Sequence, residues 1–207
     1  MTTILIYSFG YSAQGICKYL AEELPIPIKV IVDPCKPEQK TNCEIVKIID
    51  EAIKKYVGKF EIIVIANPLV ASIAGEYLKT KYCRQKFIMF GQDMSKIIRG
   101  AKKIFVLASK RVRQTKKYQE IKAACQGTEI YELDCQKWLN IVDGGWLARE
   151  RMKEEVERVC GSQIIIFHSD LLLREKRIEE VVGWRGEVND MRENLLDSLK
   201  AAMNMKI

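Results

Sequence analysis

Five polar side chains directly follow apolar segments that have the composition of buried strands: Ser8, Asp33, Asn67, Ser109 and His168. In an open parallel sheet, ligands bind outside the carboxyl ends of the strands. His168 is the only histidine of the chain, and an imidazole can give or take a proton near neutral pH. With Asp170 two residues further on, it could form a catalytic acid/base pair. The alternative is a histidine that caps a strand end through hydrogen bonds to the backbone.

Several hydroxyl and amide groups near these strand ends could hold a carboxylate or a phosphate by hydrogen bonds. The candidates for ligand binding are Ser8, Asn67, Ser72, Ser109 and Ser169. Residues 8–15 (SFGYSAQG) contain glycines but lack the dinucleotide pattern G-x-G-x-x-G, and no P-loop occurs. A phosphate loop after the first strand stays open as an alternative. For Asn67, Ser72 and Ser109, the alternative role is the capping of the helix that follows.

Basic residues crowd the segment after Ser109: Lys110, Arg111, Arg113, Lys116 and Lys117. Cations at the amino end of a helix oppose the helix dipole. An anion bound there would offset that cost, with Lys110 and Arg111 as its ligands. A solvated basic face is the alternative.

The chain has seven cysteines, an odd number, and no C-x-x-C pair. This pattern predicts neither a disulfide framework nor a zinc site, so we expect no bound metal. Free thiols are typical of a reducing compartment, and we expect a cytoplasmic protein. Cys35 follows a predicted strand and could act as a nucleophile, although an isolated cysteine is usually inert.

Apolar runs alternate with amphipathic segments along the chain. We predict strands over residues 3–8, 27–33, 63–66, 87–90, 103–108, 128–133 and 163–168. We predict helices over residues 12–24, 42–57, 69–81, 111–125, 136–142, 147–159, 170–182 and 190–203. This alternation is typical of an α/β fold with parallel sheets flanked by helices.

The strand–helix series runs twice, with a break near residues 91–101. We therefore expect two similar small domains: residues 1–95 plus 190–207, and residues 96–189. The ligand site is expected in a cleft between them.

The composition limits the classes of partner. Net charge is +7 with a sequence pI near 9.0, which permits an anionic ligand. No apolar run approaches the roughly 18–20 residues of a membrane span, and no signal-peptide pattern precedes the first strand. No nucleic-acid module is recognisable. We expect a small anionic molecule as ligand, no nucleic-acid or membrane partner, and leave a homodimer open.

The strand-end segments, taken in order, resemble the glutamate racemase family of the aspartate/glutamate racemase superfamily. Residues 8–15 (SFGYSAQG) are similar to its D-S-G-x-G-G, residues 32–39 (VDPCKPEQ) to G-D-x-x-x-x-P-Y-G, and residues 66–72 (ANPLVAS) to A-C-N-T-A-S. Residues 108–121 (ASKRVRQTKKYQEI) are similar to G-T-x-x-T with its Tyr-containing helix. Residues 134–143 (DCQKWLNIVD), 167–173 (FHSDLLL) and 186–190 (GEVND) are similar to A-C-P-x-F-V-P-L-V-E, G-C-T-H-Y-P-L-L and V-x-x-I-D. Nearly the whole chain is covered, and no single motif is intact.

The resemblance implies a racemase fold and a reaction without a cofactor. In the family, two thiols on opposite sides of a cleft remove and return the α-proton of an amino acid. The two cysteines fall on Asn67 and His168 of this chain, the leading acid on Ser8, and the second motif's histidine on Asp170. An amide cannot serve as a general base, so the two-thiol reaction is not expected.

Three hypotheses for the function stay open at this point. The first is a divergent racemase-like protein with a degenerate active site that binds a small carboxylate or phosphate. The second is a cofactor-independent isomerase, decarboxylase or lyase that uses His168 as acid/base. The third is a genuine amino-acid racemase with relocated catalytic groups.

Overall fold

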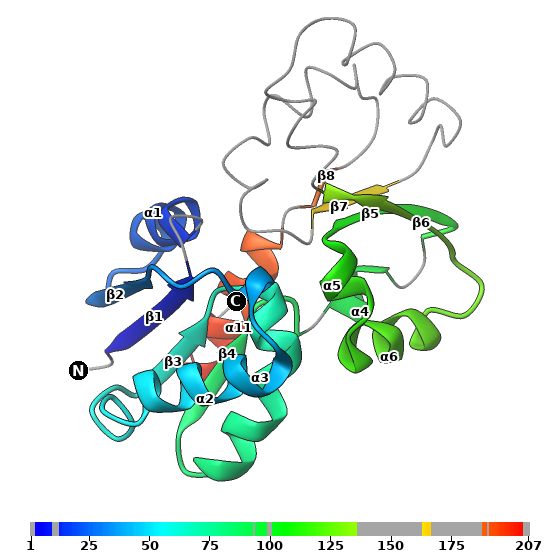
Figure 1. The fold of residues 1–207 in the computed structure, drawn as a ribbon. Coiled ribbons are helices and arrows are strands. Elements are labelled where there is room, and N and C mark those ends of the chain that lie inside the picture. The colour runs from blue at the N-terminus through cyan, green and yellow to red at the C-terminus, as the bar shows by residue number, and fades with distance from the viewer. Residues whose placement is uncertain are drawn as a thin grey trace, which may run out of the picture.

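The described residues form two separate four-stranded parallel sheets (Figure 1). This computed structural model describes residues 3–9, 13–92, 94–98, 101–135, 163–166, 188–189 and 191–204. The first sheet has the order β2-β1-β3-β4, with β1 (Ile4–Phe9), β2 (Ile28–Asp33), β3 (Ile62–Ile65) and β4 (Lys86–Met89). The second has the order β6-β5-β7-β8, with β5 (Lys103–Ala108), β6 (Glu129–Asp134), β7 (Gln163–Ile166) and β8 (Val188–Asn189). The predicted α/β fold with parallel sheets is therefore confirmed.

The inner strands are apolar because helices cover both of their faces. All six residues of β1 and all four of β3 are buried, as expected for the centre of a parallel sheet. Polar groups can lie only at the ends of such strands. The sequence of the inner strands thus confines any polar site of this sheet to its edges.

The helices of the first half begin where their sequences provide caps. They are α1 (Ala13–Glu23), the short 3-10 helix η1 (Pro37–Gln39), α2 (Asn42–Ile53) and α3 (Pro68–Lys81). Thr41 and Glu44 form a capping box at the start of α2. Ile45, Ile49 and Ile53 are buried at a spacing of four residues, which gives α2 one apolar face toward the core.

The second half departs from the predicted helices in two places. A helix expected over residues 111–125 is divided into α5 (Lys110–Arg113) and α6 (Lys116–Ala124), because the Thr115 side chain accepts a hydrogen bond from the Tyr118 N–H and starts a new helix. The short α4 (Met94–Ile98) was not predicted. Helices predicted over residues 136–142, 147–159 and 170–182 lie outside the described residues.

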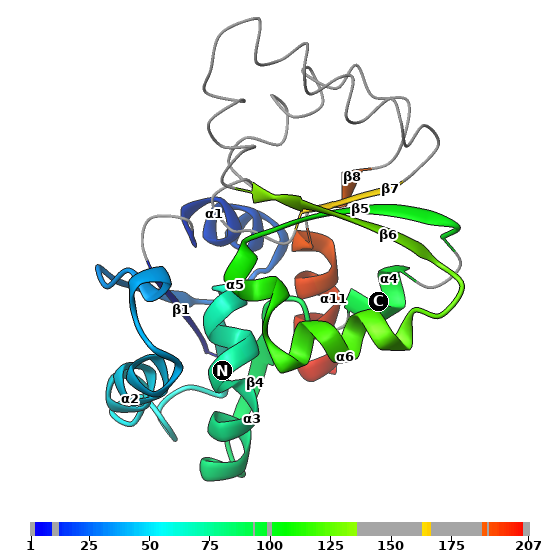
Figure 2. The ribbon, with the colours of Figure 1, turned by 45° about the vertical axis from the view of Figure 1, so that its right-hand side comes forward.

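The last helix, α11 (Arg192–Ala202), contacts α1 and β4 of the first half. Figure 2 shows it behind α6, between the two sheets. The Lys86 ammonium group of β4 donates a hydrogen bond to the Ala202 carbonyl at 3.1 Å. Since β8 pairs with β7 in the second sheet, the chain returns to the first half directly after β8.

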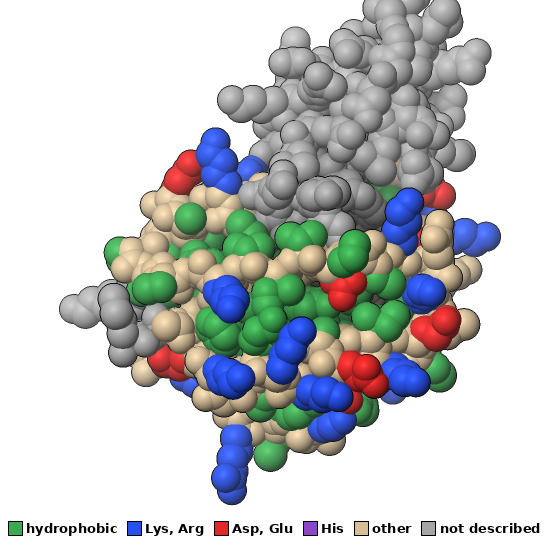
Figure 3. Space-filling view, turned by 60° about the vertical axis from the view of Figure 1, so that its left-hand side comes forward, with side chains coloured by type: hydrophobic (Ala, Val, Ile, Leu, Met, Phe, Trp, Pro, Cys, Tyr) green, Lys and Arg blue, Asp and Glu red, His purple; other side chains and the backbone are tan. Residues whose placement is uncertain are grey.

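Strand β2 forms an open edge of the first sheet. Val30 and Val32 are 41% and 38% exposed there. On the face turned toward this side of the molecule, hydrophobic side chains gather in the middle with lysine and arginine side chains around them (Figure 3). In the part of the chain that the structure describes, no helix is long and apolar enough to cross a membrane.

The return of α11 to the first half predicts a large effect of Leu199→Ala. Leu199 is fully buried, so its truncation should lower the free energy of unfolding by about 2–5 kcal/mol. Asp197→Ala, at an exposed position of the same helix, should change it by less than about 0.5 kcal/mol. Urea unfolding of both variants measures the difference. Equal effects would mean that α11 does not contribute to the core.

Candidate functional site

Two buried polar side chains lie at the carboxyl ends of neighbouring strands of the first sheet. Only three polar side chains are buried among the described residues: Ser8, Asn67 and Thr115. Ser8 lies near the end of β1, and Asn67 lies just past β3, which pairs with β1. The Ala66 N–H donates to the Tyr7 carbonyl at 2.9 Å, so the pairing of β3 with β1 continues to the residue before Asn67.

Asn67 begins helix α3. Its Oδ1 accepts a hydrogen bond from the Val70 N–H at 3.0 Å, and the next residue, Pro68, has no N–H to donate. No described residue accepts a hydrogen bond from the Asn67 Nδ2 group or from the Leu69 N–H. The amino end of α3 therefore carries one side-chain donor and one backbone donor that the described protein groups do not use.

Ser8 is fully buried, but among the described residues its hydroxyl reaches only the Phe9 carbonyl, at 3.5 Å. That distance is longer than an ordinary O–H···O hydrogen bond. Thr115 differs, because its hydroxyl donates to the Val112 carbonyl at 2.7 Å and accepts from the Tyr118 N–H at 3.2 Å. Buried polar groups normally have hydrogen-bond partners. The long hydrogen bond of Ser8 and the Asn67 Nδ2 group without a described acceptor therefore indicate a place for a ligand or ordered water.

A buried tyrosine holds the carboxylate at the end of β2. The Tyr7 hydroxyl donates to Asp33 Oδ2 at 2.5 Å, and the Cys35 N–H donates to Asp33 Oδ1 at 2.8 Å. Burial, followed by the hydrogen bond to Asp33, raises the pKa of Tyr7 well above its usual range. Asp33 was expected at a strand end, but Tyr7 was missed because the interaction joins residues on neighbouring strands.

Ser109 and Arg111 contact the segment that follows β2. The Ser109 hydroxyl caps α5 by accepting from the Val112 N–H at 3.2 Å, and it lies 3.5 Å from Glu38 Oε1. The Arg111 guanidinium donates to the Pro37 carbonyl at 2.7 Å and to Asn42 Oδ1 at 3.0 Å. These bonds connect the second half to the first. Protein acceptors thus occupy two donors of Arg111.

The exposed Lys110 stands beside Ser109 and Arg111 at the start of α5. Among the described residues, none of these three forms a hydrogen bond with Ser8 or Asn67, so the predicted residues fall into two groups. An anion between the groups stays a prediction.

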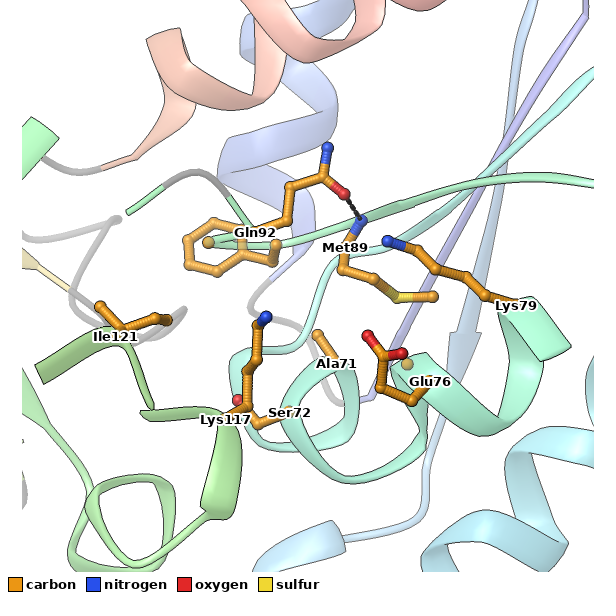
Figure 4. Close-up of a pocket in the computed structure, with 11 residues that line it drawn as sticks. Ala71, Ser72, Glu76, Lys79, Met89, Gln92, Lys117 and Ile121 are labelled. Atoms are coloured by element: carbon orange, nitrogen blue, oxygen red, sulfur yellow. Dashed lines mark hydrogen bonds between the residues drawn. The ribbon is translucent and has the colours of Figure 1, made fainter. Parts of the chain in front are cut away.

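Ser72 lines a separate cavity of about 230 Å³. Its walls come from α3, from the end of β4 and from α6 of the second half (Figure 4). Lys79 and Glu76 extend from α3 and Lys117 from α6. The sequence placed Ser72 at the strand-end site, whereas the structure places it one helical turn further on, where α3 meets α6.

The predicted acid/base pair His168 and Asp170, and the predicted ligand residue Ser169, lie outside the described residues. Cys17 is half-buried, and burial raises the pKa of its thiol to about 11, which opposes formation of the reactive thiolate. Within the described ranges, no three His, Cys, Asp or Glu residues are grouped as metal ligands.

The comparisons with known proteins identify the fold. The sequence matches no protein-family model and no curated protein. Glutamate racemase from Francisella tularensis, solved with D-glutamate, is similar with a TM-score of 0.77 and 17% identity, over 98% of this chain and 82% of that chain. Glutamate racemase from Campylobacter jejuni is similar with a TM-score of 0.79 and 15% identity, over 99% and 87%. Allantoin racemase from Klebsiella pneumoniae is similar with a TM-score of 0.64 and 12% identity, over 99% and 89%.

These structures share their fold with this chain over most of both lengths. The fold implied by the resemblance, that of the aspartate/glutamate racemase superfamily, is confirmed. At these low sequence identities the similarity shows a shared fold, and it does not assign the substrates of those proteins to this chain.

The hydrogen bond from Tyr7 to Asp33 predicts an alkaline pH dependence. The pKa of Tyr7 is raised above its ordinary value of 10.0, so its protonated hydroxyl stabilises the fold fully below pH 10 and this contribution is lost as the pH rises further. Tyr7→Phe should lower the free energy of unfolding by about 1–3 kcal/mol at neutral pH. The difference from the wild type should shrink above about pH 10. Urea unfolding over a pH series tests this, and a constant difference would contradict it.

Proposed function

We propose that this racemase-like protein binds a small carboxylate or phosphate in a cleft between two domains, and that it lacks two-thiol racemase activity. The domains would be residues 1–95 plus 190–207 and residues 96–189. The anion would lie beyond the carboxyl ends of β1 and β3, close to Ser8 and Asn67. No cofactor is part of the proposal.

The observation that carries this proposal is the pair of underused donors at the start of α3. Asn67 Nδ2 and the Leu69 N–H form no hydrogen bond with the described residues, and the amino end of a helix favours negative charge. A hydrogen bond to a charged group contributes about 1.5–3 kcal/mol. On the neighbouring strand, the Ser8 hydroxyl has only a long hydrogen bond to the Phe9 carbonyl. The net charge of +7 draws anions toward the protein.

Asn67 also supports the loss of racemase chemistry. It occupies the strand end where the resembling family has its first cysteine, and its Oδ1 is committed to the Val70 N–H. An amide does not titrate in a useful range and cannot remove an α-proton. A ligand at this place would therefore be held by Asn67 and would not be deprotonated by it.

Two enzymatic alternatives are still supported by residues in the sequence. In one, His168 with Asp170 acts as the single acid/base of an isomerase, decarboxylase or lyase that acts on a small carboxylate. In the other, the protein is a genuine racemase in which a thiol such as Cys35 has been relocated. Both alternatives require proton transfer at carbon, which simple binding does not.

The proposed loss of two-thiol chemistry predicts no exchange of the α-proton. Purified protein should leave the α-hydrogen of L- and D-glutamate and of L- and D-aspartate unexchanged in deuterated water, because Asn67 cannot form a thiolate. Proton NMR of the amino acids measures exchange directly. Enzyme-dependent exchange that is abolished by alkylation of Cys35 would contradict the proposal and favour the relocated racemase.

The proposed anion site predicts ligand-dependent thermal stability that depends on Asn67. The wild-type melting temperature should rise with increasing concentration of a small carboxylate or phosphate. The rise should be smaller at high salt, because exposed charges are screened over roughly 8–10 Å at physiological ionic strength. Asn67→Asp keeps an oxygen that can cap α3 but replaces the amide donor with a negative charge. This variant should melt cooperatively without responding to the anions.

A second pair of variants separates binding from folding. Asn67→Ala removes both the cap and the donor, and should lower stability by about 1 kcal/mol. His168→Ala should reduce the response to anions far more than it reduces the melting temperature if His168 contacts the ligand. An unchanged response in Asn67→Asp would exclude Asn67 as a ligand. No response in the wild type to any tested anion would overturn the binding proposal.

A further inference from the structure

The open edge of strand β2 presents unpaired backbone groups. The Pro27 carbonyl accepts a hydrogen bond from the Ile4 N–H of β1 at 3.3 Å, so Pro27 faces β1. The backbone N–H and C=O groups of successive residues point to opposite sides of a strand. Those of Lys29, Ile31 and Asp33 therefore point toward β1, as the Pro27 carbonyl does. The N–H and C=O groups of Val30 and Val32 point to the open side. Strand β2 has no neighbour there among the described strands.

The middle of this edge lacks the features that usually prevent pairing with another chain. Natural edge strands carry inward charges, bulges or prolines, whereas the middle of β2 reads Val30, Ile31 and Val32. Val30 and Val32 are two of the four large hydrophobic side chains that are exposed among the described residues. The only charges of the strand, Lys29 and Asp33, stand at either side of the apolar residues.

We propose that β2 pairs antiparallel with β2 of a second copy of this chain, about a two-fold axis at Ile31. In this register Val30 lies opposite Val32 of the partner subunit, and the pair exchanges both N–H···O=C bonds. The two sheets become one continuous sheet. The register also places Lys29 directly opposite Asp33 of the partner subunit, and Asp33 opposite the partner's Lys29.

Charge complementarity selects this register. Only every second residue of β2 has its N–H and C=O groups on the open side. Alternative registers of the partner strand therefore differ by steps of two residues. One step places Lys29 opposite Ile31 of the partner subunit, or Ile31 opposite the partner's Asp33. Two steps place two lysines or two aspartates opposite each other, which is destabilising. Only the register centred on Ile31 pairs each charge with its opposite.

The negative charge is already positioned for such a pair. The Tyr7 hydroxyl and the Cys35 N–H hold the Asp33 carboxylate at the end of β2. Lys29 is exposed, with its ammonium group 5.7 Å from the centre of the Tyr56 ring. Lys29 and Asp33 have the same parity along the strand and so lie on one face of the sheet, where non-hydrogen-bonded pairs bring opposing side chains closest.

Sedimentation velocity over a concentration series tests the interface with the full chain. The wild type should form a dimer whose fraction rises with concentration. Val30→Lys should raise the dimer dissociation constant at least about tenfold, because the two-fold axis introduces the charge twice into the edge. Tyr131→Lys is the matched control, because Tyr131 is 39% exposed on β6, the edge strand of the other sheet. It should change the constant by less than about twofold.

A cysteine cross-link tests the register independently of affinity. Opposing residues of a non-hydrogen-bonded pair have Cα atoms about 4.5 Å apart, within the range that a disulfide spans. Ile31→Cys should therefore give a disulfide-linked dimer with oxidised glutathione, above the background that the native cysteines give in the wild type. Val32→Cys should not exceed that background, because the partner's Val32 lies diagonally across the axis.

Each result has a defined meaning. A monomer at all concentrations, or a dimer that persists unchanged in Val30→Lys, would overturn the proposal. Cross-linking through Val32→Cys in place of Ile31→Cys would overturn the register centred on Ile31. Circular dichroism of each variant confirms that it is folded before the comparison is made.

Discussion

The burial of Ser8 and Asn67 at the ends of two otherwise apolar strands is the constraint on which the site depends. Strands β1 and β3 are buried along their whole length, so polar side chains can appear only where these strands end. Asn67 ends one strand and caps the next helix in a single residue. This double role fixes the amino end of α3 at the carboxyl end of β3, and it leaves the Asn67 Nδ2 group and the Leu69 N–H without an acceptor among the described residues.

The second half is held against the first by hydrogen bonds and by helix packing. Arg111 donates to Pro37 and Asn42 in the segment after β2, and helix α3 of the first half contacts α5 and α6 of the second. The basic segment after Ser109 therefore has a structural role, in addition to the anion binding that its sequence suggested. The segment after β2, which follows Asp33 and contacts Arg111, also carries Glu38. Charges of both signs therefore lie near the site.

Local patterns predicted the elements well, and long-range contacts lay beyond them. Continuous apolar runs predicted β1, β3 and β5, and the strand-end position of Asn67 was correctly expected. The division of the helix at Thr115 was missed because a threonine is as acceptable inside a helix as at its start until its cap is seen. The two-residue strand β8 is too short to leave a pattern. The bonds of Tyr7 to Asp33 and of Arg111 to Pro37 join distant segments, and no spacing in the sequence encodes them.

The central claim is that the Asn67 amide and the Leu69 N–H hold an anion. NMR of ¹⁵N-labelled protein, titrated with a small carboxylate and then with phosphate, observes both donors directly, with the Asn67 side-chain signal assigned by its loss in Asn67→Asp. The account predicts that both signals shift together and saturate with one dissociation constant for one of these anions. Signals that stay unchanged while the anions reach millimolar concentrations would contradict it.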